Sequence, residues 1–199
     1  MADVTVNDLV PIVTVGTLLD KNSLYIVLQP LSISVEDNGY YHWAIYIVDD
    51  QGQTTRHHWV QVQMQRRSSP NRPEEYDHRV IGEGRALNAT PNTHHPILMY
   101  AKVQGYRAPA AGTYDFVGKF RAIFGNDSFP TTSENRENGT SCATFVSRAI
   151  DRLVQDGVIN GDRSTIINRT RLASYVLHQM LARQDIHPYT STQPYLFRA

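Results

Sequence analysis

The sequence has only one cysteine, Cys142, and no excess of charge of either sign. A single cysteine excludes an internal disulfide and a cysteine-rich metal site. Lysine plus arginine equals aspartate plus glutamate, at 19 each, so the overall charge favours neither nucleic acid nor a lipid surface as partner. No apolar run approaches the roughly 20 residues of a membrane span, and the first residues lack the pattern of a signal peptide. We therefore expect a cytoplasmic protein with no nucleic-acid partner and no membrane span.

The composition is that of a globular chain. Of the 199 residues, 41% are hydrophobic and 19% are charged, which is enough to build one sizeable core. The sequence shows no internal repeat and no boundary between two domains. We expect a single domain over residues 1–199, with its core at about 23–183 and a C-terminal tail at 184–199.

Several segments are rich in strand-forming residues. Residues 40–48 (Tyr-Tyr-His-Trp-Ala-Ile-Tyr-Ile-Val) give the strongest signal, and residues 57–65 alternate apolar and polar side chains after a turn. The two segments predict a β-hairpin. Further strands are expected at 23–34, with a break at Pro30, and at 96–106, and an edge strand or extended arm at 8–17.

Helical spacing of apolar residues predicts three helices. They lie within 113–124, from Cys142 to about Asp156, and from Ser164 or Thr165 to about Arg183. Residues 66–75 and 126–138 are predicted to be polar loops. Strands and helices together indicate an α+β fold, with an antiparallel sheet packed against the cysteine-bearing helix and at least one more helix.

Cys142 lies where a helix is expected to begin. Thr140 or Ser141 can cap that helix, and the positive end of the helix dipole favours a thiolate over a thiol. Such a thiolate can be a nucleophile, with the Cys142 backbone N–H forming part of an oxyanion hole. The alternative is that Cys142 is a small core residue on an apolar helix face.

A cysteine nucleophile needs a base, and the base needs a group that orients it. Among the eight histidines, His42 stands out because it opens a hydrophobic strand, although it could equally be a half-buried structural histidine. Centring the hairpin turn near Gln51-Gly52 places Gln61 opposite His42, where its amide can accept the imidazole N–H. His58 is the competing partner.

Three motifs in this order resemble the circularly permuted NlpC/P60 superfamily, and within it the lecithin:retinol acyltransferase-like branch. The pattern is equally similar to fungal proteins that combine a strand histidine with a cysteine helix. The resemblance implies an acyl transfer through a thioester on Cys142, with His42 as base. The motifs are Tyr41-His42-Trp43-Ala44-Ile45-Tyr46-Ile47-Val48, His57-His58-Trp59-Val60 and Ser141-Cys142-Ala143-Thr144-Phe145-Val146.

The sequence thus predicts a cysteine-dependent acyl-transfer enzyme: an amide or ester hydrolase, an acyltransferase or a biosynthetic cyclase. Its catalytic residues would be Cys142 and His42, with Gln61 or His58 as the orienting group. Its substrate would be a small molecule or an acyl group, with no cofactor and no metal. Two alternatives remain open. One is a binding or interaction module of the same fold with Cys142 buried, and the other is a cyclase that uses acid–base chemistry without a covalent intermediate.

Overall fold

A computed structural model describes residues 3–12, 17–30, 41–62, 71–83, 97–125, 127–184 and 194–199. In this part of the chain, a seven-stranded sheet and four α-helices form a mixed α+β fold. The fold class predicted from the sequence is confirmed at this level. The elements are η1 (Val6–Asp8), β1 (Val10–Pro11), β2 (Ser23–Pro30), β3 (Tyr41–Val48), β4 (Gln53–Gln61), β5 (Glu74–Glu83), β6 (Met99–Lys102), α1 (Phe116–Arg121), α2 (Thr132–Glu137), α3 (Cys142–Gln155), α4 (Arg163–Arg183) and β7 (Tyr195–Arg198).

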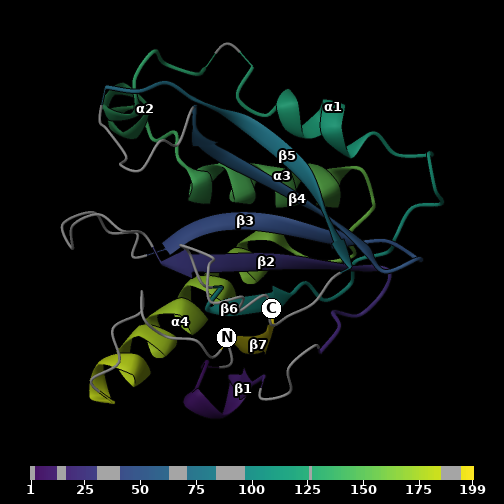
Figure 1. Ribbon diagram of the computed structural model, residues 1–199, viewed down its shortest axis with the longest axis vertical. Coiled ribbons are helices and arrows are strands. Elements are labelled where there is room, and N and C mark those ends of the chain that lie inside the picture. Colours follow the sequence, from purple (N-terminus) through teal and green to yellow (C-terminus); the bar gives the residue numbers. More distant parts are fainter. Residues whose placement is uncertain are drawn as a thin grey trace.

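The strands are ordered β1-β7-β6-β2-β3-β4-β5, and β5 is one edge of the sheet. All neighbours are antiparallel except β6 and β7, which are parallel. Figure 1 shows α3 running across β3 and β4, α1 beside β5, and α4 beside β6.

The two faces of the sheet have different neighbours. The face of Trp43, Ile45 and Ile47 packs against Phe145 of α3 and Leu177 of α4, and we call it the helix face. Because side chains alternate along a strand, the next residues lie on the opposite, second face. On that face Ala44, Tyr46 and Val48 form a separate cluster with Tyr25, Val27 and Tyr100.

The β3–β4 hairpin is the feature that places the candidate site. Asp49 Oδ1 accepts backbone bonds from Gln51 and Gln53 at 2.9 and 2.8 Å, and Gly52 supplies the positive φ of 88° that the turn requires. The resulting register pairs Ala44 with His58. Two residues further along, Val60 rather than Gln61 lies across from His42. A one-residue change of register exchanges the two faces of a strand, so the predicted pairing of Gln61 with His42 is wrong.

The other predicted elements agree with the structure to different degrees. Strands β2 and β6 and helices α1, α3 and α4 all lie within or close to their predicted ranges. Ser141 caps α3 as expected, its hydroxyl accepting the Thr144 N–H at 3.1 Å, whereas the cap of α4 is Asp162.

Three elements differ from the sequence prediction. Strand β5 was not predicted, and its first residues lie in the loop predicted at 66–75. Helix α2 forms inside the predicted loop at 126–138, where Thr131 and Glu134 build a capping box. Strand β7 lies in the predicted tail, and it enters the sheet by pairing with β1 and β6.

Candidate functional site

Two histidines and an aspartate form a continuous hydrogen-bonded chain across three strands of the second face. Nε2 of His42 on β3 lies 2.9 Å from Nδ1 of His58 on β4. Nε2 of His58 lies 3.0 Å from Oδ2 of Asp77 on β5. The two imidazoles meet edge to face, with ring centroids 5.1 Å apart and an interplanar angle of 74°. We call His42, His58 and Asp77 the relay.

The register of the sheet explains why these residues meet. His58 lies directly opposite both Ala44 and Asp77, so all three project on the second face. His42 is two residues before Ala44 on the same face of β3, one step diagonally from His58. The contact thus follows from the hairpin turn and from pairing in the β4–β5 ladder.

The central imidazole is neutral at pH 7. Burial lowers the pKa of His58 to about 4, and the nearby positive charge of Arg56 acts in the same direction. Asp77 is ionised: burial would raise its pKa, but the hydrogen bond from His58 and the charge of Arg56 lower it.

These protonation states assign the tautomers of the relay. An ionised Asp77 can only accept, so His58 carries its proton on Nε2 and donates it to the carboxylate. Nδ1 of His58 is then an acceptor, and His42 must donate its Nε2–H to it. In neutral His42 the acceptor nitrogen is therefore Nδ1, on the side of the ring away from His58. A base lone pair at Nδ1 is what a proton-abstracting histidine needs.

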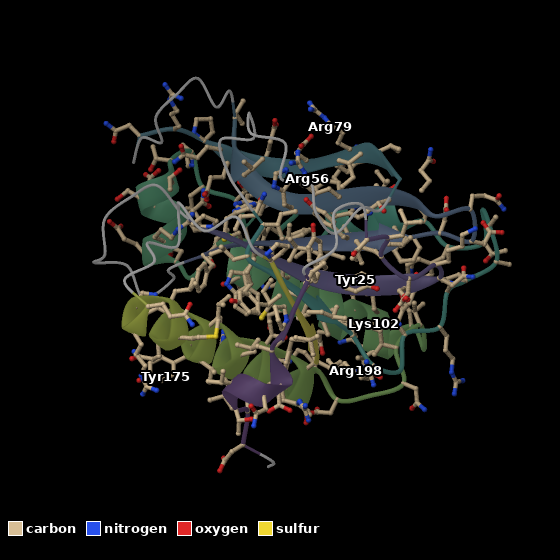
Figure 2. All side chains as sticks on the ribbon, turned by 60° about the horizontal axis from the view of Figure 1, so that its bottom comes forward. Tyr25, Arg56, Arg79, Lys102, Tyr175 and Arg198 are labelled. Atoms are coloured by element: carbon tan, nitrogen blue, oxygen red, sulfur yellow. The ribbon has the colours of Figure 1, made fainter. Side chains whose placement is uncertain are left out.

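Two arginines flank the relay. Arg56 lies two residues before His58 on the same face of β4, and its Nη2 is 3.4 Å from Oδ2 of Asp77. Arg79 is the cross-strand partner of Arg56 in the β4–β5 ladder. Figure 2 shows the two arginines close together at this end of the sheet.

Cys142 lies on the other side of the sheet. It belongs to the core cluster of the helix face with Trp43. His42 projects from the opposite face of β3, toward His58. The expected meeting of the two side chains across a cleft is therefore not what the structure shows. The physical reason is the alternation of β3, where Trp43 occupies the face turned toward α3.

The electrostatics of Cys142 also differ from the expectation. The thiol is buried, with 9% of the residue exposed, and burial raises its pKa, although the backbone of Trp43 and the charge of Arg136 act in the opposite direction. The sequence argument from the helix dipole predicted a shift in the opposite direction. Desolvation has the largest effect on the thiol because the side chain is buried. Whether Cys142 or His42 has a catalytic role stays a prediction.

Gln61 is on the helix face, and its Nε2 donates to Thr132 Oγ1 of α2 at 2.8 Å. Its bond holds α2 against β4, so it does not orient His42. The neighbouring His57 also lies on the helix face. There its Nδ1 is 2.7 Å from the Tyr76 hydroxyl and its ring meets Phe120 edge to face. Of the orienting candidates, His58 alone among the described residues contacts His42 as expected.

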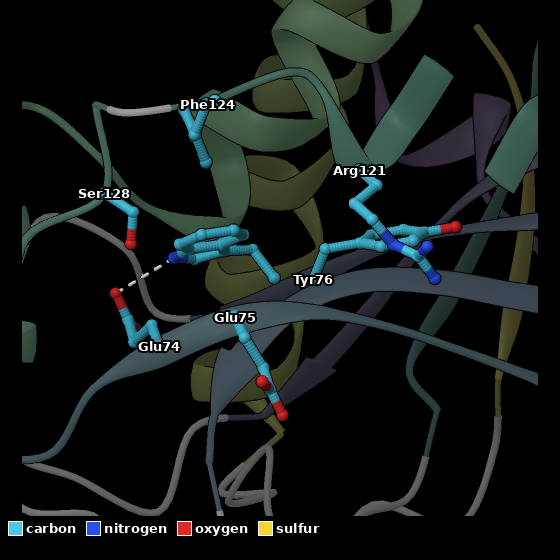
Figure 3. Close-up of a pocket in the computed structure, with 8 residues that line it drawn as sticks. Glu74, Glu75, Tyr76, Arg121, Phe124 and Ser128 are labelled. Atoms are coloured by element: carbon cyan, nitrogen blue, oxygen red, sulfur yellow. Dashed lines mark hydrogen bonds between the residues drawn. The ribbon is translucent and has the colours of Figure 1, made fainter. Parts of the chain in front are cut away.

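The helix face has an open pocket of about 230 Å³ at its β5 edge, drawn in Figure 3. Its buried acid is Glu74, which accepts from Trp59 Nε1 at 3.1 Å and forms an ion pair with Arg136 of α2, Oε1 to Nη2, at 2.6 Å. Both carboxylate oxygens are thus occupied within the fold. The residues that line the pocket are Trp59, Glu74, Glu75, Tyr76, Arg121, Phe124, Gly125 and Ser128.

Asp77 was the member of the relay that sequence reasoning missed. A usable signal existed, since Tyr76, His78 and Val80 alternate with Asp77 and Arg79 in the manner of a strand. Within the described ranges no three histidine, cysteine, aspartate or glutamate side chains are grouped as a metal site requires. The adjacent histidines His94 and His95 lie outside those ranges. No helix in the described part of the chain is long and apolar enough to cross a membrane.

Comparison of the chain with protein-family models, with curated proteins and with solved structures gives no significant match.

Proposed function

We propose that this protein is an enzyme of general acid–base chemistry, in which His42 removes and returns a proton while His58 and Asp77 orient it. The observation that carries this proposal is the pair of consecutive hydrogen bonds, 2.9 Å from His42 to His58 and 3.0 Å from His58 to Asp77. A base whose tautomer is fixed by a second group, itself fixed by a carboxylate, is the arrangement that proton-transfer catalysis uses.

The proton path follows from the tautomers. Nδ1 of His42 accepts a proton from the substrate, and the electron pair of the broken bond stays on the substrate. The proton on His42 Nε2 can then shift to Nδ1 of His58, whose imidazolium is stabilised by Asp77. Return of the proton by the same path to another substrate atom completes an isomerisation, an elimination or a cyclisation. No covalent intermediate is needed.

The thioester route through Cys142 is the competing proposal, together with the permuted NlpC/P60 fold and a cytoplasmic location. It is supported by the position of Cys142 at the start of α3 and by the order of histidine strand before cysteine helix. It requires the thiol to reach a base. Because Cys142 lies on the helix face and His42 on the second face, the relay is the favoured proposal.

A generic proton-transfer probe tests the proposal without knowledge of the substrate. In 5-nitrobenzisoxazole, removal of one proton from carbon breaks the N–O bond and releases a coloured phenolate. We expect the wild-type protein to accelerate this ring opening, and His42→Ala to lose about 100-fold of the acceleration. Cys142→Ala should keep it, because the thiol lies on the other face.

The thermal unfolding of each variant is measured beside its rate, so that loss of fold is not mistaken for loss of a base. Equal rates in wild type and His42→Ala would remove His42 as the base. Loss of the rate in folded Cys142→Ala would instead support the thiol proposal.

A further inference from the structure

The arginine pair beside the relay is placed at an energetic cost that the fold does not explain. Arg56 and Arg79 are direct partners in the β4–β5 ladder, where like charges destabilise the sheet. Asp77 is the acidic neighbour of both arginines: its 3.4 Å contact with Arg56 is long for a charged hydrogen bond, and Arg79 lies two residues from it on the same face of β5. In the described part of the chain no ion pair of Arg79 is found, and its side chain is exposed.

Arg56 also carries an unused donor. Its Nε is buried and has no hydrogen-bond partner, although 23% of the side chain is exposed. A buried donor without a hydrogen-bond partner destabilises the fold. A guanidinium presents its N–H groups as a planar fork, and the fork matches the two oxygens of a carboxylate or phosphate.

We propose that Arg56 and Arg79 bind the anionic group of the substrate, so that the relay acts on a small organic acid or phosphate ester. This inference rests on the function proposed above, and it names the substrate class of the same site. An oxyanion between the two guanidiniums would take up the free Nε–H of Arg56 and screen the repulsion between the arginines. It would hold the rest of the molecule beside His58 and His42.

The electrostatics of His58 support this placement. The charges of Arg56 and Arg79 both lower the pKa of His58, so both guanidiniums lie within reach of the imidazole. An anion bound between the two guanidiniums would offset their positive charge. The pKa of His58 would then rise, and the relay would accept a proton more readily. Substrate binding and proton abstraction would therefore favour each other.

The test uses inorganic phosphate and acetate as probes, and NMR of the arginine Nε–H and histidine Nε2–H groups as readout. We expect one or both probes to give a saturable shift of Arg56 Nε–H with a change at His58 Nε2–H. Saturation by acetate alone would indicate a carboxylate substrate, and saturation by phosphate alone a phosphate ester. Arg79→Gln should weaken binding about tenfold and Arg56→Gln more.

Lys102→Gln is the matched control, because Lys102 is on the same face but three strands from Arg56, about 14 Å away, and is paired with Asp20 at 2.6 Å. It should bind both probes as the wild type does. Shifts that do not saturate, or that are unchanged in the exposed-site variant Arg79→Gln, would overturn the inference. Because the readout is binding, this result is separate from the rate test. An active relay without anion binding contradicts only the inference, and anion binding without activity contradicts only the function.

Discussion

The imidazoles of His42 and His58 face each other across the β3–β4 ladder, with Nε2 of the first 2.9 Å from Nδ1 of the second. The next contact, to Asp77, fixes the direction of both hydrogen bonds. Because the carboxylate can only accept, His58 donates its Nε2–H to Asp77 and His42 donates its Nε2–H to His58. The relay is thus a polarised chain, in which Nδ1 is the acceptor nitrogen of a neutral His42.

Asp77→Asn should lower the rate of 5-nitrobenzisoxazole opening by about tenfold with little change in thermal stability. The amide removes the charge that stabilises a protonated His58, and its NH₂ group can force the wrong tautomer. Glu75→Gln is the matched control, since it changes an exposed carboxylate two residues away on the same strand. Equal loss in both variants would show that the effect is general electrostatics rather than the relay.

Cys142 should react slowly with iodoacetamide at pH 7 in the folded protein, at least about tenfold slower than in urea. Burial raises the pKa of the thiol, so that little thiolate is present and little of it is accessible. His42→Ala should leave the labelling rate unchanged, because the imidazole is on the other face. Labelling near pH 6 that depends on His42 would favour the thioester route.

Glu74→Gln should destabilise the protein by about 2 kcal/mol in urea unfolding. The buried Glu74 carboxylate receives Arg136 at 2.9 and 2.6 Å, and the substitution removes the charge that Arg136 needs. The exposed neighbour Glu75→Gln should change stability by less than about 0.5 kcal/mol. Similar values for the two variants would mean that the Glu74–Arg136 pair contributes little.

Stability should fall with acid between pH 6.5 and 4.5. Burial lowers the pKa of His57 to about 3 and that of His58 to about 4, whereas the unfolded chain titrates near 6.5. Below pH 6.5 the unfolded state binds more protons than the folded state. Each histidine therefore lowers the free energy of unfolding by about 1.4 kcal/mol per pH unit. His57→Phe should therefore roughly halve this slope, and near pH 7 it should lower stability through loss of the Tyr76 bond. An unchanged slope would contradict the assignment.

The sequence predicted the parts of the fold that depend on local patterns. The alternation of residues 40–48 and the helical spacing after Cys142 are strong, and both elements formed where expected. The short strand β7 carries no such pattern, and its place between β1 and β6 depends on long-range pairing.

The candidate site was predicted in part. His42 and His58 were both identified, but their partner Asp77 lies on a strand that the pattern did not reveal. Gln61 was assigned to the wrong face because the turn spans Asp49–Gln53, which shifts the register by one residue. The predicted Cys142–His42 pair assumed that the histidine faces the helix. Neighbouring residues of a strand point to opposite faces. The packing of Trp43 against α3 decides that Trp43, and not His42, lies on the helix face.

The most direct test of the relay is NMR of ¹⁵N-labelled imidazoles at pH 7. We predict that His42 and His58 are both protonated at Nε2, and that a scalar coupling across the hydrogen bond joins His42 Nε2 to His58 Nδ1. The coupling should disappear in His58→Phe. A proton on Nδ1 of His58, or the absence of the coupling in the folded wild-type protein, would contradict the account.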